Sequence, residues 1–197
     1  MDNTIVVLCA KSGSGKDSLA KLINALDYKF VISTTTRPIR NCESEKNPYY
    51  FVSDSEFANL IRDKQLIEYR TYETLVNGTP NTWWYGVNKS EIQDNEKYVV
   101  VLDIHGLKEF KKLYGNRVLS FYIHVEDEER EKRAIQRGGF DKTEWDRRLK
   151  DDNKVFNLQD VEIHVDKLVC NSELTQCLSD IATEISFYSL EVNDMEV

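Results

Sequence analysis

A glycine-rich segment between a strand-like run and a helix-like run constrains this chain more than any other feature. Residues 10–18 read A-K-S-G-S-G-K-D-S. The apolar run Ile5–Cys9 precedes them, and Leu19, Leu22 and Ile23 follow at helical spacing. A buried strand, a glycine-rich turn and a helix N-terminus in this order are the context of a phosphate-binding P-loop. The sequence therefore predicts an α/β protein that binds a polyphosphate.

The residue types of this loop suit phosphate. Gly13 and Gly15 allow backbone N–H groups to approach phosphate oxygens, and Lys16 adds a positive charge at a helix N-terminus. The usual pattern G-x-x-x-x-G-K-[ST] is incomplete, because Ala10 replaces the first glycine and Asp17 the hydroxyl residue. Asp17 is either a Mg²⁺ ligand, directly or through water, or an acidic residue that favours the helix start.

Composition excludes several classes of function. The chain has 197 residues, 41% hydrophobic and 30% charged, which are values of a globular domain. A net charge of −8 argues against a general nucleic-acid surface. Without an apolar stretch of membrane-spanning length or a signal peptide, we expect a cytoplasmic protein with no membrane partner. The scattered residues Cys9, Cys42, Cys170 and Cys177 predict reduced thiols, not a zinc site.

Hydrophobic periodicity predicts alternating strands and helices. The expected strands are 5–9, 29–33, 49–52, 66–76, 97–104, 118–125 and the region of 168–170. The expected helices are 53–63, capped by Ser53 with Glu56, a short one after 104, 126–137, 144–156 and 172–185. Residues 34–48 read as a loop, Asn77-Gly78 as a hairpin turn, and His124 and His164 as parts of strands.

This order predicts a three-layer α/β P-loop kinase fold with a mostly parallel central sheet. Residues 34–96 interrupt the alternation and mix strands with a helix, so they are a candidate inserted substrate-binding subdomain. The expected core comprises 1–33, 97–137 and 157–188, with a lid at 138–156 and a loose acidic tail at 189–197.

Two sets of arginines extend the phosphate hypothesis. Arg37 and Arg40 lie three residues apart, followed by Tyr49, and guanidinium groups with a tyrosine hydroxyl suit a monophosphate. Arg133 and Arg137 share a helix face, and Arg148 follows Gly138-Gly139. The second set either closes over the P-loop or belongs to a charged surface helix.

Here the sequence resembles a known family, the guanylate kinases, over about residues 4–185. The motifs that carry the resemblance are S-T-T-T-R-P-I-R at 33–40, Y-Y-F-V-S at 49–53, L-I-E-Y at 66–69, Y-G at 85–86, V-L-D-I at 101–104, the arginines of 133–149, and V-C-N-S at 169–172. Together they are far more specific than the P-loop alone.

The resemblance implies ATP-dependent phosphoryl transfer to GMP or dGMP, with Mg²⁺ as cofactor and a monomer or homodimer as the assembly. The residues it assigns to the GMP phosphate are Arg37, Arg40, Tyr49 and Tyr85, and those it assigns to guanine are Ser33 and Glu68, with Asp103 nearby. The residues assigned to ATP are Ser12, Gly13, Ser14, Gly15, Lys16, Asp17, Ser18, Arg133, Arg137 and Asn171. The catalytic residues it implies are Lys16, Arg37, Arg137 and Arg148.

The chain also departs from the family. Val87 follows Tyr85-Gly86 where a serine or threonine usually helps to bind guanine, and His105 replaces a second aspartate. The segment from Glu68 to Tyr85 is longer than usual and leads to Trp83-Trp84, which either pack the hairpin or reshape the nucleotide pocket. Two alternatives stay open: a kinase similar to the ribose 1,5-bisphosphate kinases, whose loop resembles residues 13–19, and a non-catalytic binding module.

Overall fold

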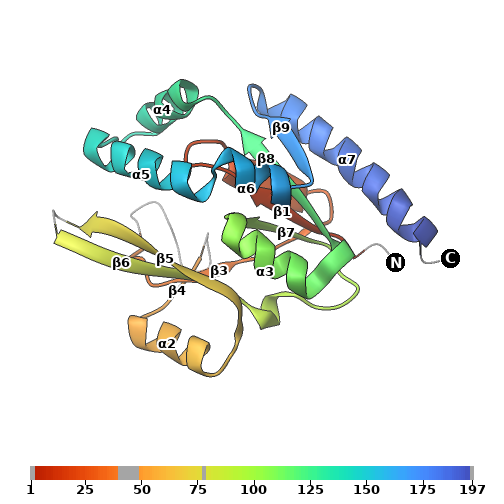
Figure 1. Ribbon diagram of the computed structural model, residues 1–197, viewed down its shortest axis with the longest axis horizontal. Coiled ribbons are helices and arrows are strands. Elements are labelled where there is room, and N and C mark those ends of the chain that lie inside the picture. Colours follow the sequence, from red (N-terminus) through yellow and green to blue (C-terminus); the bar gives the residue numbers. More distant parts are fainter. Residues whose placement is uncertain (1–2, 40–48, 77–78, 196–197) are drawn as a thin grey trace. The chain divides into compact units, whose positions relative to one another are not determined.

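The computed structural model describes residues 3–39, 49–76 and 79–195, and the chain divides into two compact units (Figure 1). The first unit contains residues 1–30 and 95–197. The second unit contains residues 31–94, a segment inserted in the sequence of the first.

The first unit is built on a five-stranded sheet in which all paired strands are parallel. The strand order is β2-β7-β1-β8-β9. The strands are β1 (Ile5–Cys9), β2 (Lys29–Phe30), β7 (Tyr98–Leu102), β8 (Val118–His124) and β9 (Lys167–Cys170). The central strands are continuous apolar runs because helices cover both faces of such a sheet.

Seven helical segments belong to this unit among the described residues. They are α1 (Lys16–Asn24), α3 (Ile104–Tyr114), the 3₁₀ turn η2 (Gly115–Arg117), α4 (Asp127–Gln136), α5 (Lys142–Val155), α6 (Leu158–His164) and α7 (Leu174–Met195). The buried faces of α1 and α7 pack with Val6, Leu8 and Phe121 of the sheet in one hydrophobic core. Helix α3 packs against β1, β7 and β8, and α6 packs against α3.

The second unit holds a smaller mixed sheet of four strands in the order β4-β3-β6-β5. The elements are β3 (Ser33–Thr35), β4 (Tyr49–Phe51), α2 (Asp54–Arg62), β5 (Leu66–Val76), β6 (Thr79–Asn88) and the 3₁₀ turn η1 (Lys89–Glu91). Strands β3 and β4 are parallel, whereas β6 pairs antiparallel with both β3 and β5. The predicted capping box is confirmed, since Ser53 and Glu56 bond each other's backbone N–H at the start of α2.

The α/β fold class is confirmed, and several local expectations are wrong. The expected strand at 29–33 ends at Phe30, and β3 begins at Ser33 in the other sheet and continues to Thr35 in the expected loop. His164 ends a helix instead of a strand, and that helix, α6, was not expected. Helix α7 continues to Met195, beyond the expected end and through the expected loose tail. The Asn77-Gly78 turn lies outside the described residues, although β5 and β6 pair up to Val76 and Thr79.

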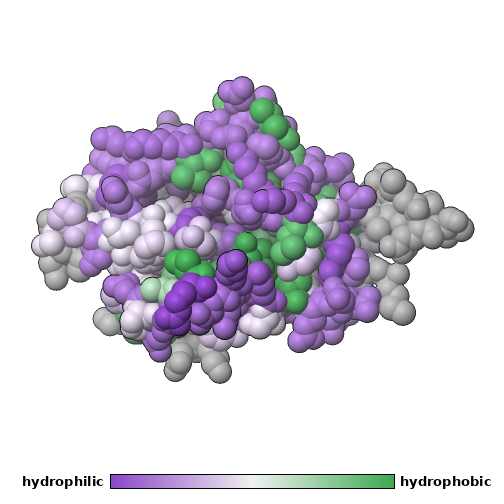
Figure 2. Space-filling view, turned by 60° about the horizontal axis from the view of Figure 1, so that its bottom comes forward, coloured by the Kyte–Doolittle hydropathy of each residue, from purple (hydrophilic) through white to green (hydrophobic). Residues whose placement is uncertain are grey.

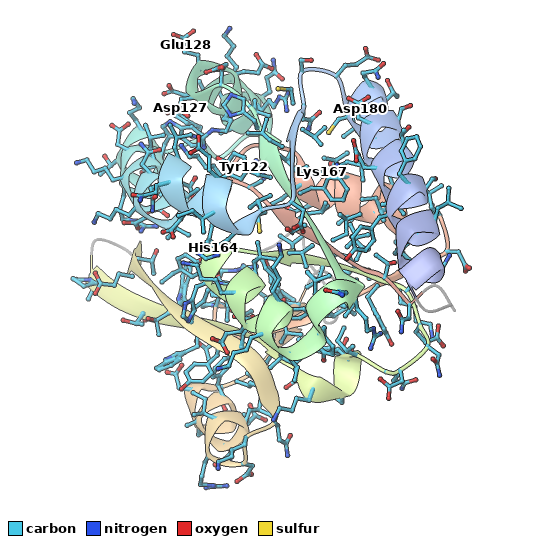
Figure 3. All side chains as sticks on the ribbon, turned by 45° about the vertical axis from the view of Figure 1, so that its right-hand side comes forward. Tyr122, Asp127, Glu128, His164, Lys167 and Asp180 are labelled. Carbon is cyan, nitrogen blue, oxygen red and sulfur yellow. The ribbon has the colours of Figure 1, made fainter. Side chains whose placement is uncertain are left out.

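The surface is strongly polar. Figure 2 shows hydrophilic residues over most of the visible face, with apolar residues in smaller groups among them. Acidic side chains such as Asp127 and Glu128 on α4 and Asp180 on α7 are labelled in Figure 3. In contrast, Tyr122 of β8 is buried beside Phe156, and burial raises the pKa of its phenol to about 12. Among the described residues, no helix combines the length and apolar character needed to cross a membrane.

Candidate nucleotide-binding sites

The predicted P-loop connects the carboxyl end of β1 to α1. Gly15 is the N-cap residue of α1 and has a left-handed φ of 86°, and Gly13 has a φ of 81°. A Cβ atom on Gly13 would lie 2.9 Å from the carbonyl oxygen of Arg130, and one on Gly15 would lie 2.7 Å from Nδ2 of Asn171. Both positions therefore require glycine for conformation and for space.

Two side chains from distant segments hold this loop in place. Arg130 of α4 is 1% exposed, and its Nη1 donates to the carbonyl oxygen of Ser12 at 2.7 Å. The backbone N–H of Ser12 donates to Oδ2 of Asp152 of α5 at 2.7 Å. Arg130 also reaches Asp127 at 2.6 Å and Asp152 at 3.4 Å, and its guanidinium lies over the Trp145 ring. The loop is thus bonded on both its carbonyl and its amide side.

Asp152 places a carboxyl group beside the P-loop, which is expected to bind the negatively charged phosphates. Burial raises the pKa of its carboxyl group, and the Ser12 N–H, Lys16 and Arg130 oppose that rise by favouring the charged form. The neighbouring Asn153 accepts a hydrogen bond from Nζ of Lys11 at 2.6 Å. Helix α5 therefore contacts the loop through two consecutive residues, neither of which was a candidate from the sequence.

Two of the residues assigned to ATP meet the loop from another side. Asn171 is 2% exposed, and its Nδ2 donates to the carbonyl oxygen of Ser14 at 2.8 Å. Arg133 donates from Nη2 to the carbonyl oxygen of Asn171 at 2.8 Å and pairs with Glu129 at 3.1 Å. The hydroxyl of Ser14 is buried and has no hydrogen-bond partner among the described residues, so a polar donor lies within the loop.

The charged residues at the start of α1 fit a nucleotide with a divalent cation. Lys16 and Asp17 form an ion pair at 3.6 Å, and the Asp17 side chain is 64% exposed. Mg²⁺ is commonly bound by one or two carboxylates together with substrate phosphates, so an exposed carboxylate in this turn is a suitable ligand. Within the described part of the chain, no three His, Cys, Asp or Glu side chains cluster as a metal site of their own.

The arginines of the expected lid differ in their surroundings. Arg148 donates from Nε to Glu144 at 2.7 Å, and Arg147 pairs with both Glu144 and Asp151. The Arg147 hydrogen bond, with Arg148 adding to it, lowers the pKa of Glu144 to about 2. Arg137 is the C-cap residue of α4 and is exposed. Arg148 is therefore held within its helix, whereas Arg137 extends into solvent.

A second cluster lies in the smaller unit and is centred on Arg37. Arg37 is 3% exposed, and its guanidinium lies 5.5 Å from the ring centroid of Tyr49 and 5.4 Å from that of Phe51. The rings of Tyr49 and Tyr85 meet edge to face at 5.7 Å. A small pocket lined by Arg37, Phe51 and their neighbours opens beside them. The structure thus brings together three of the residues assigned to the GMP phosphate.

The same sheet places Glu68 in a buried ion pair. Oε2 of Glu68 accepts a hydrogen bond from Nη1 of Arg70 at 2.7 Å, and the side chains are 0% and 17% exposed. Arg70 also donates from Nε to the Tyr72 hydroxyl at 3.1 Å, and the Tyr72 ring meets Tyr85 edge to face at 5.4 Å. Sequence reasoning missed Arg70, although its place two residues after Glu68 puts both on one strand face.

The remaining assigned residues are distributed as follows. Ser33 lies in β3, paired with Tyr49 of β4. Asp103 belongs to the larger unit, where its Oδ1 accepts the Gly106 N–H and caps α3. Arg40 lies outside the described residues, as does Cys42, whereas Cys9, Cys170 and Cys177 are free thiols.

The tryptophans of the long hairpin lie in adjacent positions of β6. Trp84 packs near Phe57 of α2 and Tyr69 of β5, with ring centroids 5.8 and 6.1 Å away. Trp83 pairs with Tyr72 across the hairpin. The contacts of Trp84 therefore support packing of the hairpin, one of the two interpretations left open by the sequence.

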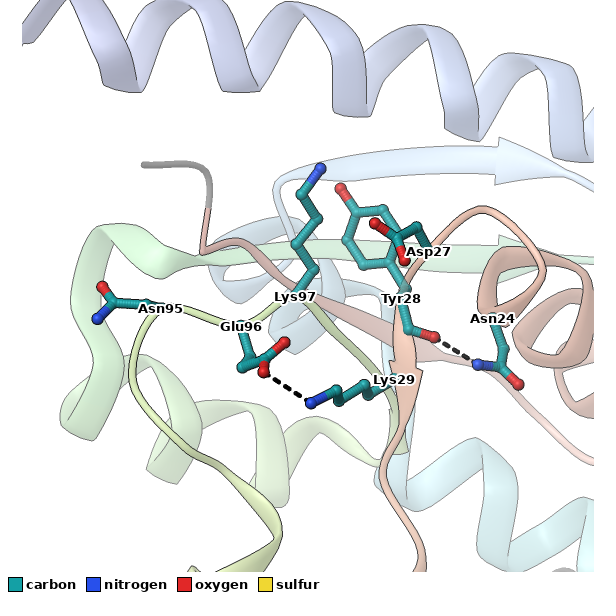
Figure 4. A pocket seen from close by; sticks show the side chains of 7 residues that line it. All are labelled: Asn24, Asp27, Tyr28, Lys29, Asn95, Glu96 and Lys97. Atoms are coloured by element: carbon teal, nitrogen blue, oxygen red, sulfur yellow. Dashed lines mark hydrogen bonds and ion pairs between the residues drawn. The ribbon is translucent and has the colours of Figure 1, made fainter.

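A further polar pocket lies at the amino ends of the parallel strands in the larger unit (Figure 4). Lys29 and Glu96 form an ion pair across it at 2.7 Å. Asp27 and Asn95 in its wall have left-handed φ values of 70° and 62°, which these residue types tolerate in turns. Ligands of open parallel sheets bind at the carboxyl ends of the strands, where the P-loop lies, so this pocket is not assigned to the reaction.

The parallel sheet and the glycine loop at the carboxyl end of β1 define an α/β nucleotide-binding protein of the P-loop class. Comparison narrows the class, because the guanylate kinase family model matches residues 2–188. The guanylate kinase of Fusobacterium nucleatum is 29% identical over 186 residues, which cover 92% of this chain and 95% of that protein. The chain therefore belongs to the guanylate kinase family.

Solved structures agree on the fold. The crystal structure of guanylate kinase from Anaplasma phagocytophilum matches with a TM-score of 0.66 and 21% identity, over 95% of this chain and 86% of that one. A gluconokinase from Sinorhizobium meliloti matches with a TM-score of 0.59 and 13% identity, over 100% and 98% of the two chains. Because both identities are low, these matches describe the fold, and the substrate must be argued from the residues.

Proposed function

We propose that this protein transfers the terminal phosphate of ATP to GMP or dGMP. The observation that carries the proposal is the Glu68 carboxylate, held on the same small sheet as the cluster of Arg37, Tyr49 and Tyr85. A carboxylate suits guanine, whose N1–H and N2–H₂ are neighbouring donors, and a guanidinium with tyrosine hydroxyls suits a monophosphate. Adenine lacks that pair of donors and would leave the carboxylate unsatisfied.

In this proposal the P-loop binds the phosphates of ATP. The N–H groups around Gly13 and Gly15 and the charge of Lys16 receive phosphate oxygens at the N-terminus of α1. Arg133 and Asn171 hold the loop on one side, and Asn171 is expected to lie near adenine. We assign the lid role to residues 138–156 and the GMP-binding role to residues 34–96.

The chemistry requires positioning more than proton transfer. In-line attack by a GMP phosphate oxygen on the γ-phosphorus breaks the bond to the bridging oxygen and releases ADP, which needs the two nucleotides aligned and their charge neutralised. Lys16, Arg37, Arg137 and Arg148 are the cations that we assign to this task. Asp17 would be a ligand of Mg²⁺, which would supply further positive charge to the ATP phosphates.

A coupled assay of ADP release tests the proposal. GMP, dGMP, AMP and ribose 1,5-bisphosphate are offered separately, each with ATP and Mg²⁺. We expect turnover with GMP or dGMP and none with AMP. Turnover of the sugar phosphate alone would support the sugar-kinase alternative, and GMP binding without any turnover would support the binding-module alternative.

A further inference from the structure

The Glu68–Arg70 ion pair places a cation beside the carboxylate that is assigned to guanine. A carboxylate that reads guanine provides two acceptors, and these match N1–H and N2–H₂. The remaining group on this edge of guanine is O6, an acceptor beside N1–H. A site that reads the whole edge therefore needs a donor next to one oxygen of Glu68.

Arg70 places a donor at that position. Its Nη1 lies 2.7 Å from Oε2 of Glu68, so a charged N–H group borders the carboxylate. The Tyr72 hydroxyl holds the other side of the guanidinium at 3.1 Å, and the guanidinium lies 5.8 Å from the Tyr72 ring centroid. A guanidinium has five N–H donors in a rigid plane, enough to hold Glu68, Tyr72 and a substrate oxygen together.

Val87, the residue opposite Glu68 on the neighbouring strand, has no side-chain donor for guanine O6. Val87 pairs with Glu68 in the β5–β6 register, and its apolar side chain is fully buried. Apart from Ser33 of β3, which the resemblance assigns to guanine, a donor for a base oxygen on this face can come from the strand that carries Glu68 itself. Arg70 is the next residue on the same face of that strand.

We infer that Arg70 is a specificity-determining residue that donates a hydrogen bond to O6 of the guanine base while it orients Glu68. This inference rests on the proposed function. Glu68 and Arg70 then present acceptor, acceptor and donor, the complement of N2–H₂, N1–H and O6. Adenine would place its N6–H₂ donor against Arg70 and its N1 acceptor against Glu68, so it is disfavoured at both points.

The test pairs one substitution with one change in the ligand. Wild-type protein and Arg70→Met are titrated calorimetrically with GMP and with 6-thioguanosine 5′-monophosphate, without ATP, at pH 6.5. The thio analogue keeps N1–H and N2–H₂ and replaces O6 by sulfur, a weak acceptor. We expect the wild type to prefer GMP by about 10-fold or more, and Arg70→Met to lose most of that preference and to bind GMP about 10- to 100-fold more weakly.

Two further variants control for folding and charge. Arg62→Met removes an exposed arginine of the same unit, paired only with its neighbour Asp63 in the described contacts, and should leave both affinities unchanged. Arg70→Lys keeps a cation beside Glu68 but not the planar set of donors, so it should fold and lose part of the preference. Circular dichroism checks that each variant is folded.

Each outcome decides the inference. If Arg70→Met weakens both ligands equally, Arg70 acts only through Glu68 and the O6 contact is wrong. If the wild type binds both ligands equally, the contact is also wrong, and this result needs no variant. If the wild type does not bind GMP at all, the proposed function fails. That result differs from one in which the protein phosphorylates GMP but substitution of Arg70 leaves the affinities unchanged.

Discussion

The guanidinium of Arg130 joins three segments of the larger unit. It bonds the Ser12 carbonyl of the P-loop, pairs with Asp127 of its own helix and with Asp152 of α5, and lies 5.7 Å from the ring centroid of Trp145. Its burial was not predictable from the sequence, because residues 126–133 alternate charges as an exposed helix does. A buried arginine of this kind fixes the loop through geometry more than through net pairing energy.

Replacing Arg130 with Met tests this role. We expect the free energy of unfolding to fall by about 3 kcal/mol, because Asp152 stays buried with one cation fewer. The KM for ATP should rise as the loop loses its carbonyl contact. Urea denaturation and steady-state kinetics measure the two effects.

Two companion variants make the Arg130 result specific. Lys132→Met, an exposed position on the same helix, should change neither quantity. Adding Asp152→Asn to Arg130→Met should recover part of the lost stability, since the neutral amide can still accept the Ser12 N–H. A double variant no more stable than the single one would contradict the coupling.

Glu144 gives helix α5 a predictable pH dependence. Its pKa is about 2, below the unfolded value of 4.5, because Arg147 and Arg148 stabilise the carboxylate. A lowered pKa stabilises the fold above pH 4.5, and that contribution is lost as the pH falls toward 2. Glu144→Gln should therefore lower stability at pH 7 by about 1 kcal/mol, allowing for solvent screening, with a smaller loss at pH 3. Urea denaturation at both pH values tests this, and an equal loss at both would contradict it.

At the scale of elements, the end of α7 allows two contributions to stability to be compared: a hydrogen bond of Tyr188 to the rest of the unit, and the helical residues that follow it. The Tyr188 hydroxyl donates to the carbonyl oxygen of Asn116 at 2.6 Å, whereas Leu190 is 64% exposed. Truncation after Ser189 should change the melting temperature by no more than a few degrees, because Leu190, where the removed segment begins, is exposed. Tyr188→Phe should cost about 1 kcal/mol through the lost hydrogen bond. A truncation that costs more than Tyr188→Phe would show that the last turns pack against the protein.

The sequence predicted most elements, and its errors have local causes. The runs 5–9 and 118–124, the second interrupted by Ser120, predicted buried strands well, because their length is that of a strand and shorter than that of most helices. The short strand β3 was missed because Thr34 and Thr35 are polar residues buried by the small sheet. Helix α6 has only seven residues, too few for a periodic pattern.

For the whole molecule, sequence motifs predicted a site for ATP and a site for GMP, but they did not predict the side-chain contacts within each site. Lys16, Arg37 and Glu68 lie in segments whose chemistry is visible in the sequence. Arg70 and Asp152 could not be found that way. Arg70 is a candidate only because it pairs with Glu68 on the same strand, and Asp152 only because helix packing brings it to Ser12 of the P-loop. Long-range partners of this kind need the fold before they can be named.

The division into two units leads to a prediction for the complete protein. Each nucleotide should slow hydrogen exchange mainly in the unit that holds its site, because binding stabilises only states with the site formed. At about 100 times Kd, the gain is about 2.7 kcal/mol, or up to about 100-fold slower exchange. GMP should protect 33–37 and 66–72, and a non-hydrolysable ATP analogue should protect 11–18. AMP is the matched control for GMP and should leave 66–72 unprotected. GMP protection confined to 11–18, or equal protection by AMP, would contradict the assignment of guanine recognition to the sheet that carries Glu68.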